Sequence, residues 1–350
     1  MKTKDFDYSL PKKFIAQKPK TPRDHSKLMV YDTKNDKVHH LKFFQIADLL
    51  GENDVLVANS SKVVPARIIF HENGKEREIF VLGKTKDGEY EILVRPGKAF
   101  KKGAVLSVNK KLRFEVKDIK EDGIRVISFG GGRNVDKELE KVGQSPFPPY
   151  IKTPNVPLKR YQTIYAKEKG SVAAPTAGLH FTGSLIKNLR GKGVDFEKVI
   201  LHVGLGTFAP VKAEDIKDHI MHHELFEMPL GAATTLTKAK SSDKRIVAVG
   251  TTSVRVLETS FKNGEFHPQI SKTDIFIYPG YKWKTIDALI TNFHLPKSTL
   301  LMLVSSFLEH KGVKNPIKKL LHLYELAKKQ NYRFYSFGDA MFIFLSLIHI

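Results

Sequence analysis

The sequence predicts an α/β main domain with a mixed sheet and flanking helices, plus an inserted small six-stranded antiparallel β-barrel domain. Three observations lead to this fold class. The chain has 350 residues, more than a single domain usually holds. Residues 67–129 are short β-like runs separated by turn signals, and on either side strand and helix signals alternate. We therefore expect residues 1–65 and 150–350 to form the α/β domain and residues 66–149 to form the barrel.

The barrel is predicted from six apolar runs: RIIF, REIFVL, EYEILVRP, AVLSV, LRFEVKDI and GIRVISF. The segments between them include Asn-Gly and Asp-Gly pairs, which suit tight hairpins. Six antiparallel strands of about five residues close only a small barrel, and closure removes exposed strand edges.

The α/β domain is predicted from longer alternating patterns. Strands are expected over residues 54–61, 197–204 and 245–250, and helices over residues 182–193, 254–261 and 315–330, the first with Thr182 as its N-cap. The apolar end after Met341 is compatible with a buried last element, an interface or an irregular terminus.

The composition excludes several classes of site. There is no cysteine, which removes disulfides, thiolate nucleophiles and cysteine-ligated metal centres. The formal net charge of +21 favours a polyanionic partner such as RNA, although a generally lysine-rich composition explains it nearly as well. The N-terminus lacks the apolar core of a signal peptide and no run approaches the roughly 20 apolar residues of a membrane span, so we expect a cytoplasmic protein without membrane contact.

The central segment GSVAAPTAGLHFT carries no charge apart from that of His180. Its small residues, among them Ala173, Thr176 and Gly178, fit a wall that a flat ligand approaches closely. A tight proline turn packed under a helix cap is the alternative. If the wall exists, Ala173→Leu or Gly178→Val is expected to abolish activity and leave the fold intact.

Two further histidine segments are ambiguous. HIMHHE, with His222 and Glu224, fits a divalent metal site, acid/base chemistry without metal, or exposed side chains at the junction of two elements; we expect no metal. LHVGLGTFAPV, with His202, Gly204, Gly206 and Thr207, fits a close ligand approach or a plain bend. It lacks the third glycine of a dinucleotide fingerprint.

Three segments combine a turn with polar groups. VGTTSVR feeds a strand into a helix, so Thr251, Thr252, Ser253 and Arg255 favour a bound carboxylate or phosphate, against simple capping. ITNFHLPKS places His294 in a loop on a rigid scaffold, or in the core. IFIYPGYKW gives an aromatic corner with Tyr281, able to stack on a base or face a cation, or merely a packed turn.

Taken together, these segments resemble the S-adenosylmethionine:tRNA ribosyltransferase-isomerases of queuosine biosynthesis. The resemblance runs through FDYSLPKKFIAQKP, NDVLVANSSKVVPARI, GSVAAPTAGLHFT, LHVGLGTFAPV, HIMHHE, RIVAVGTTSVR, LITNFHLPKSTLLMLVSSF and YRFYSFGDAM. These motifs span nearly the whole chain in the family's order. The family's α/β domain with a small β-barrel agrees with the six runs counted above.

The resemblance implies an enzyme that uses S-adenosylmethionine as a co-substrate and holds no bound prosthetic group. The ribosyl group of the donor is transferred and isomerised onto 7-aminomethyl-7-deazaguanine at the tRNA wobble position. Epoxyqueuosine forms, and adenine and methionine leave. We expect the enzyme to act as a monomer.

This chemistry gives the candidate residues roles. The sulfonium acidifies the ribose 5′ protons, so one of His180, His202 or His294 is expected to act as the base. His222, Glu224 or Asp339 is the candidate acid for the departing adenine. Arg255 and the hydroxyls of residues 251–253 are expected to hold the methionine carboxylate, and Phe181, Phe208 or Tyr281 to face the sulfonium.

For RNA, two basic stretches offer cations beside aromatic residues. They contain Lys98, Lys101 and Lys102 in the barrel and Lys159 and Arg160 in the segment LKRYQ. Solvated lysines are the alternative. Three other functions compete with the ribosyl transfer: a metal-dependent hydrolase built on HIMHHE, a methyltransferase using the same donor, and a non-catalytic RNA-binding protein.

Overall fold

The computed structural model describes the whole chain except residues 121–122, 131–133, 145–146, 153–155, 205–210 and 347–350. The chain divides into two compact units. The first comprises Met1–Lys62, Pro148–Glu168 and Ala174–Ile350, and the second comprises Val63–Phe147 and Lys169–Ala173. The chain passes between them at β4 (Ser61–Val63) and β11 (Glu168–Ser171), which pair as a two-stranded sheet.

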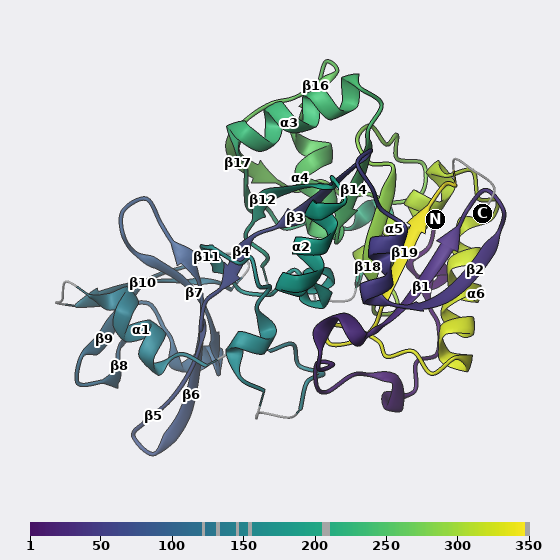
Figure 1. Ribbon diagram of the computed structural model, residues 1–350. Helices are drawn as coiled ribbons and strands as arrows, with labels where there is room; N and C mark the ends of the chain where they lie inside the picture. Colours follow the sequence, from purple (N-terminus) through teal and green to yellow (C-terminus); the bar gives the residue numbers. More distant parts are fainter. Residues whose placement is uncertain (121–122, 131–133, 145–146, 153–155, 205–210, 347–350) are drawn as a thin grey trace. The chain divides into compact units, whose positions relative to one another are not determined.

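The first unit contains a mixed nine-stranded sheet (Figure 1). Its order is β17 (Gln269–Thr273), β13 (Glu224–Met228), β12 (Asp195–Leu201), β3 (Asp54–Asn59), β14 (Arg245–Val249), β18 (Ala288–Asn292), β19 (Ala340–Phe344), β1 (Lys27–Asp32) and β2 (Lys37–Lys42). Strands β12, β3, β14 and β18 are parallel to one another. Strand β19 is antiparallel to β18 and parallel to β1, so β19 and β1 run against the central four.

The central strands are apolar because both faces of the sheet are covered. All six residues of β3 are buried. One face packs on the 3-10 helix η4 (Phe43–Asp48) and on α2 (Gly183–Gly191), and Phe43, Leu185 and Phe342 belong to the same buried cluster. Thr182 caps α2 as predicted, because its hydroxyl accepts from the Leu185 N–H at 3.2 Å.

The remaining helices of this unit are α3 (Leu230–Ser241), α4 (Thr251–Ser260), α5 (Thr299–His310) and α6 (Pro316–Lys329). Short 3-10 helices include η3 (Arg23–His25), η6 (Leu158–Tyr161), η7 (Thr176–His180) and η9 (Ile216–Asp218), and β15 (Phe261–Lys262) and β16 (Glu265–Phe266) form a small hairpin. No helix among the described residues is long and apolar enough to cross a membrane.

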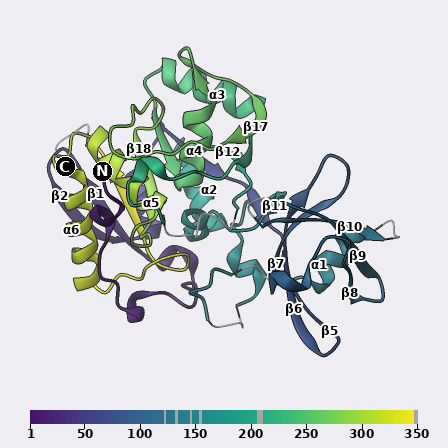
Figure 2. The ribbon, with the colours of Figure 1, turned by 180° about the vertical axis from the view of Figure 1, so that it is seen from behind.

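The second unit confirms the predicted barrel. Its sheet has the order β5 (Arg67–Glu72), β6 (Lys75–Lys84), β7 (Tyr90–Arg95), β10 (Arg125–Gly130), β9 (Leu112–Ile119) and β8 (Val105–Asn109), with every pair antiparallel (Figure 2). The Ser107 N–H of β8 donates to the Glu72 carboxylate of β5 at 3.2 Å, so the two end strands nearly close the sheet. Alternate residues such as Phe114 and Val116 point inside, and Leu139 of α1 (Val135–Val142) joins them.

The apolar C-terminal segment contains a buried strand. Phe342 and Phe344 belong to β19, whose five residues are all buried between β18 and β1. Residues 347–350 lie outside the described part. The sequence left open a buried last element, an interface or an irregular terminus. Residues Phe342–Phe344 form part of a buried strand, as in the first of these possibilities.

Candidate active site

A cavity lies in the first unit, with about 630 Å³ of free space that includes its opening to solvent, and it joins most of the segments singled out from the sequence. Its described lining includes Ala174–Ala177, Val203, Gly250–Thr252, Thr291–Leu295 and Tyr335–Ser336. None of the described lining residues is Lys, Arg, Asp or Glu. A cavity with a mostly neutral described lining and a few convergent polar groups suits a small organic ligand.

The sheet topology explains why distant segments meet here. The parallel strands β14 and β18 end at Val249 and Asn292, and ligands of open α/β sheets bind at such carboxyl ends. Because β19 and β1 run the opposite way, their first residues lie at the same edge: Ala340 pairs with both Asn292 and Leu28. Residues just before these two strands, Asp339 and Ser26, are thereby brought to the site.

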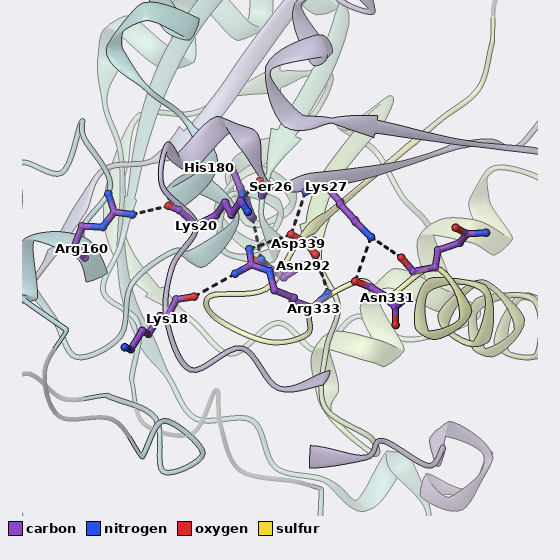
Figure 3. A network of polar contacts seen from close by, with 11 residues as sticks. Lys18, Lys20, Ser26, Lys27, Arg160, His180, Asn292, Asn331, Arg333 and Asp339 are labelled. Carbon is purple, nitrogen blue, oxygen red and sulfur yellow. Dashed lines mark hydrogen bonds and ion pairs between the residues drawn. The ribbon is translucent and has the colours of Figure 1, made fainter. Parts of the chain in front are cut away.

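A chain of side-chain hydrogen bonds leads from the cavity wall at Thr176 to His180. Figure 3 shows its part from Asn292 to His180 and Ser26. The Thr176 hydroxyl donates to Asn292 Oδ1 at 2.8 Å, and Asn292 Nδ2 lies 3.3 Å from His180 Nε2. An amide nitrogen only donates, so Nε2 accepts and the proton of the neutral ring is on Nδ1. Nδ1 therefore donates to Ser26 Oγ, 2.7 Å away. Both ring nitrogens of His180 are occupied.

The surroundings of His180 keep the ring neutral. Its side chain is buried and stacks on Phe43 with ring centroids 4.9 Å apart. Burial lowers the pKa of His180 to about 4, although the Asp339 carboxylate acts in the opposite direction. A neutral ring held at both nitrogens is well suited to positioning Asn292 and Thr176.

His294 is the histidine that lines the cavity. Its backbone is fixed, because its N–H donates to the Tyr324 hydroxyl at 3.1 Å and its carbonyl accepts from the Tyr8 hydroxyl. In the ring, Nε2 lies 3.4 Å from Thr291 Oγ1, and Nδ1 is buried without a hydrogen-bond partner among the described residues. Burial lowers the pKa of His294 to about 3, so the ring is neutral at pH 7.

The model of one protein family, described as "Queuosine biosynthesis protein", matches residues 3–343. The chain belongs to the family of queuosine biosynthesis proteins. The S-adenosylmethionine:tRNA ribosyltransferase-isomerase of Thermosipho africanus is 47% identical over 345 residues, which are 98% of this chain and 100% of the relative. That of Clostridium kluyveri is 48% identical over 347 residues, 98% of this chain and 100% of the relative.

A solved structure agrees with this assignment. The crystal structure of an S-adenosylmethionine tRNA ribosyltransferase from Thermotoga maritima matches with a TM-score of 0.55 and 37% identity, covering 97% of this chain and 99% of that chain. The relatives named above are transferase-isomerases, and this queuosine biosynthesis protein is an enzyme of that class.

Other candidate residues of this queuosine biosynthesis protein lie next to the cavity without lining it. His202 precedes the lining residue Val203; burial lowers its pKa, and its Nδ1 has no partner among the described residues. Glu224 accepts from the Gly204 N–H at 2.8 Å and forms a buried ion pair with Arg255. The Arg255 guanidinium is thus already engaged by a carboxylate.

The helix α4 presents only part of the predicted anion site to the cavity. Thr251 and Thr252 line it, and Thr252 Oγ1 is buried without a partner among the described residues. Ser253 is fully buried, and its hydroxyl donates at 2.8 Å to the carbonyl of Val249, the last residue of β14, so it is engaged inside the fold.

Three candidates lie away from the described cavity lining. The carboxylate of Asp339 accepts from the backbone N–H groups of Lys27 at 3.0 Å and Arg333 at 2.7 Å, and from the Arg333 guanidinium at 3.1 Å (Figure 3). His222 is exposed. The Tyr281 hydroxyl donates at 3.0 Å to Glu258, about two turns along α4 from the cavity.

Some predictions fall elsewhere. Gly206, Thr207 and Phe208 lie outside the described residues. Ala173 and the exposed Lys98, Lys101 and Lys102 belong to the second unit, and Lys159 and Arg160 to the first. No group of three or more His, Asp or Glu side chains within the described ranges is arranged to hold a metal ion, and this includes the HIMHHE segment.

The small-residue segment lines the cavity through Ala174, Pro175, Thr176 and Ala177. Gly178 serves packing instead. A Cβ on Gly178 would lie 2.0 Å from the Tyr165 hydroxyl oxygen and 2.9 Å from Thr163 Cγ2, both buried. The expectation that Gly178→Val leaves the fold intact is therefore wrong, because no room exists for the added atoms.

We expect Gly178→Ala to lower the free energy of unfolding of the first unit by about 1–3 kcal/mol, as is typical of overpacking. Urea unfolding followed by the fluorescence of Trp283, the single tryptophan, measures this unit. Gly183→Ala is the matched control, because nothing lies within 4 Å of the added Cβ and the position begins α2. Equal unfolding curves for the two variants would contradict the packing role.

Sequence reasoning missed Asn292, Ser26 and Ser336 as site residues. Asn292 is the last residue of the buried strand β18. A polar residue that ends a buried strand beside a turn is the signal that points to it, because such strand ends gather at one edge of the sheet. Ser26 and Ser336 carry no comparable pattern in the sequence.

Proposed function

We propose that this chain transfers and isomerises the ribosyl group of S-adenosylmethionine onto 7-aminomethyl-7-deazaguanine at the wobble position of tRNA. Epoxyqueuosine forms, and adenine and methionine are released. The observation that carries the proposal is the cavity whose described lining is uncharged and includes the imidazole of His294. S-adenosylmethionine serves as a co-substrate. The relatives named for this donor and for tRNA support the same substrates.

In the proposed mechanism His294 is the base. The donor's sulfonium acidifies the ribose 5′ protons, and an unprotonated imidazole beside it removes one of them. His294 lines the cavity and is neutral at pH 7, whereas both nitrogens of His180 are occupied. We therefore assign His180 a positioning role through Asn292. A cavity whose described lining carries no charged side chain also keeps water from the carbanion-like intermediate.

The N-terminus of α4 is the proposed anchor for the methionine carboxylate. The described cavity lining contains no lysine or arginine, whereas the first N–H groups of this ten-residue helix and the hydroxyls of Thr251 and Thr252 are available there. Arg255 does not line the cavity, and in this proposal its role is to hold the Glu224 carboxylate in place through their ion pair. Glu224 does not supply the proton that adenine needs, because its carboxylate is paired with Arg255 and accepts from the Gly204 N–H.

Adenine release tests the proposal. The protein is incubated with S-adenosylmethionine and an anticodon stem-loop RNA carrying 7-aminomethyl-7-deazaguanine, and free adenine is measured. A methyltransferase would produce S-adenosylhomocysteine instead, and a plain RNA-binding protein would leave the donor intact. Activity that disappears with a chelator would favour a metal-dependent hydrolase. No adenine with the correct RNA refutes the proposed function.

We also propose that the enzyme acts in the cytoplasm and as a monomer, since one chain supplies every described wall of the cavity. The exposed lysines of the barrel are proposed RNA contacts, together with Lys159 and Arg160. Charge reversal at Lys98, Lys101 and Lys102 is expected to weaken tRNA binding at least tenfold and to flatten its dependence on salt. Filter binding at several salt concentrations measures both; an unchanged slope excludes this loop.

A further inference from the structure

A second, smaller hollow of about 260 Å³ lies in the same unit, beside the cavity. Four cations line it: Lys20, Arg23, Arg160 and Arg333. No Asp or Glu is among the described residues that line it. We call it the basic crevice. No step of the mechanism proposed above uses these four side chains together.

The arginine side chains of the crevice are held in place by backbone carbonyls. Arg23 donates through Nη1 to the Gln162 carbonyl at 2.7 Å and through Nη2 to the Lys159 carbonyl at 2.9 Å. Arg160 donates through Nη2 to the Lys20 carbonyl at 2.6 Å (Figure 3). The segments around residues 20 and 160 thus fix each other's guanidinium groups, so that little side-chain entropy is lost when an anion binds.

The positive charge of the crevice is poorly compensated. Arg333 pairs with Asp339 at 3.1 Å. Arg23 and Arg160 form no ion pair with any described carboxylate, and neither does Lys20, whose residue is exposed. Burial lowers the pKa of Arg23, and the positive charge of Arg160 lowers it further, which means that the two cations repel each other. A bound anion relieves this repulsion.

The crevice and the cavity adjoin. Ser336 lines both, and His180, which lines the crevice, is bonded to the cavity residue Asn292 (Figure 3). We propose that the basic crevice binds a phosphodiester group of the RNA substrate, next to the nucleotide whose base enters the cavity. The inference rests on the proposed function and adds the place where the RNA backbone is held. A planar guanidinium group can donate two parallel hydrogen bonds to two oxygens of one phosphate. Several cations close together attract the negative charge of the RNA backbone.

Two variants test the crevice. Lys20→Gln removes a charge whose side chain bonds to no described residue, so the fold is preserved, and Arg160→Gln removes a fixed guanidinium. Lys18→Gln is the matched control: Lys18 is also exposed, two residues away, and its side chain points away from Arg333 in Figure 3. Binding of an anticodon stem-loop RNA is measured from low to moderate salt, together with the KM for S-adenosylmethionine in adenine release.

We expect Lys20→Gln and Arg160→Gln each to weaken RNA binding about three- to tenfold at low salt. Each should reduce the slope of log K against log salt by about 0.7–0.9, the value for one phosphate contact. Lys18→Gln and the KM for the donor should change little. Unchanged RNA binding in both variants overturns the inference, and so does a raised donor KM with unchanged RNA binding, which would assign the crevice to the methionine carboxylate. Wild-type protein that binds the RNA yet releases no adenine refutes the proposed function and leaves the crevice test valid.

Discussion

Replacing His294 by alanine is expected to lower the rate of adenine release by about 100- to 10,000-fold, the usual contribution of a general base. His294 lines the cavity, and its Nδ1 has no described partner. The contacts of His294 with Tyr8 and Tyr324 use its backbone, so they survive the substitution. The loss is therefore expected in the chemical step and not in the fold.

Single-turnover release of adenine measures this effect, with unchanged Trp283 fluorescence as evidence of folding. His39→Ala is the control, because His39 is exposed on the edge strand β2. The pH profile gives a second readout. With a pKa near 3, His294 is unprotonated above about pH 4. Protonation of His294 is therefore not expected to lower the rate of adenine release near pH 6.5. Full activity in the His294, His180 and His202 variants would end the idea of an imidazole base.

The barrel was predictable because its signals are local. Each strand is a short apolar run, and the pairs that join strands are turn signals such as Asn73-Gly74. Asn73 is in the left-handed conformation that such turns require, with φ 50°. Strand β2, in contrast, escaped prediction because its residues KVHHLK are half-buried or exposed and show no apolar stripe. The helix α3 escaped because its sequence LGAATTLTKAKS is rich in threonine and is stabilised by burial of Ala232, Ala233 and Leu236.

The candidate site was predictable only in part, for a different reason. Uncharged segments with Gly, Thr and His stand out in a lysine-rich chain, so His180, Thr251 and His294 were found. Which of them share a cavity depends on tertiary contacts. His180 and Asn292 are 112 residues apart, and only the reversal of direction between β18 and β19 brings Asn292, Asp339 and Ser26 to one edge. No local pattern carries that information.

Acidification from pH 6.5 to pH 4.5 is expected to cost the first unit about 2 kcal/mol of stability through His180 alone. In the unfolded chain this histidine titrates near 6.5, whereas burial lowers its pKa to about 4 in the fold. Between these values the unfolded state binds the extra proton, so stability is fully present above pH 6.5 and falls with pH at up to about 1.4 kcal/mol per unit.

Urea unfolding at pH 6.5, 5.5 and 4.5, followed by Trp283 fluorescence, measures the dependence in the wild type and in His180→Gln. The variant has no imidazole to protonate at this position, so its stability should fall by about 2 kcal/mol less over the range, whatever its stability at pH 6.5. His39→Gln, at an exposed position, should keep the wild-type slope. The other buried histidines are present in both proteins, so their effect on stability is the same in the two plots of stability against pH and drops out of the difference between the slopes. Parallel slopes for wild type and His180→Gln would mean that His180 takes up as many protons in the fold as in the unfolded chain, which would contradict its lowered pKa.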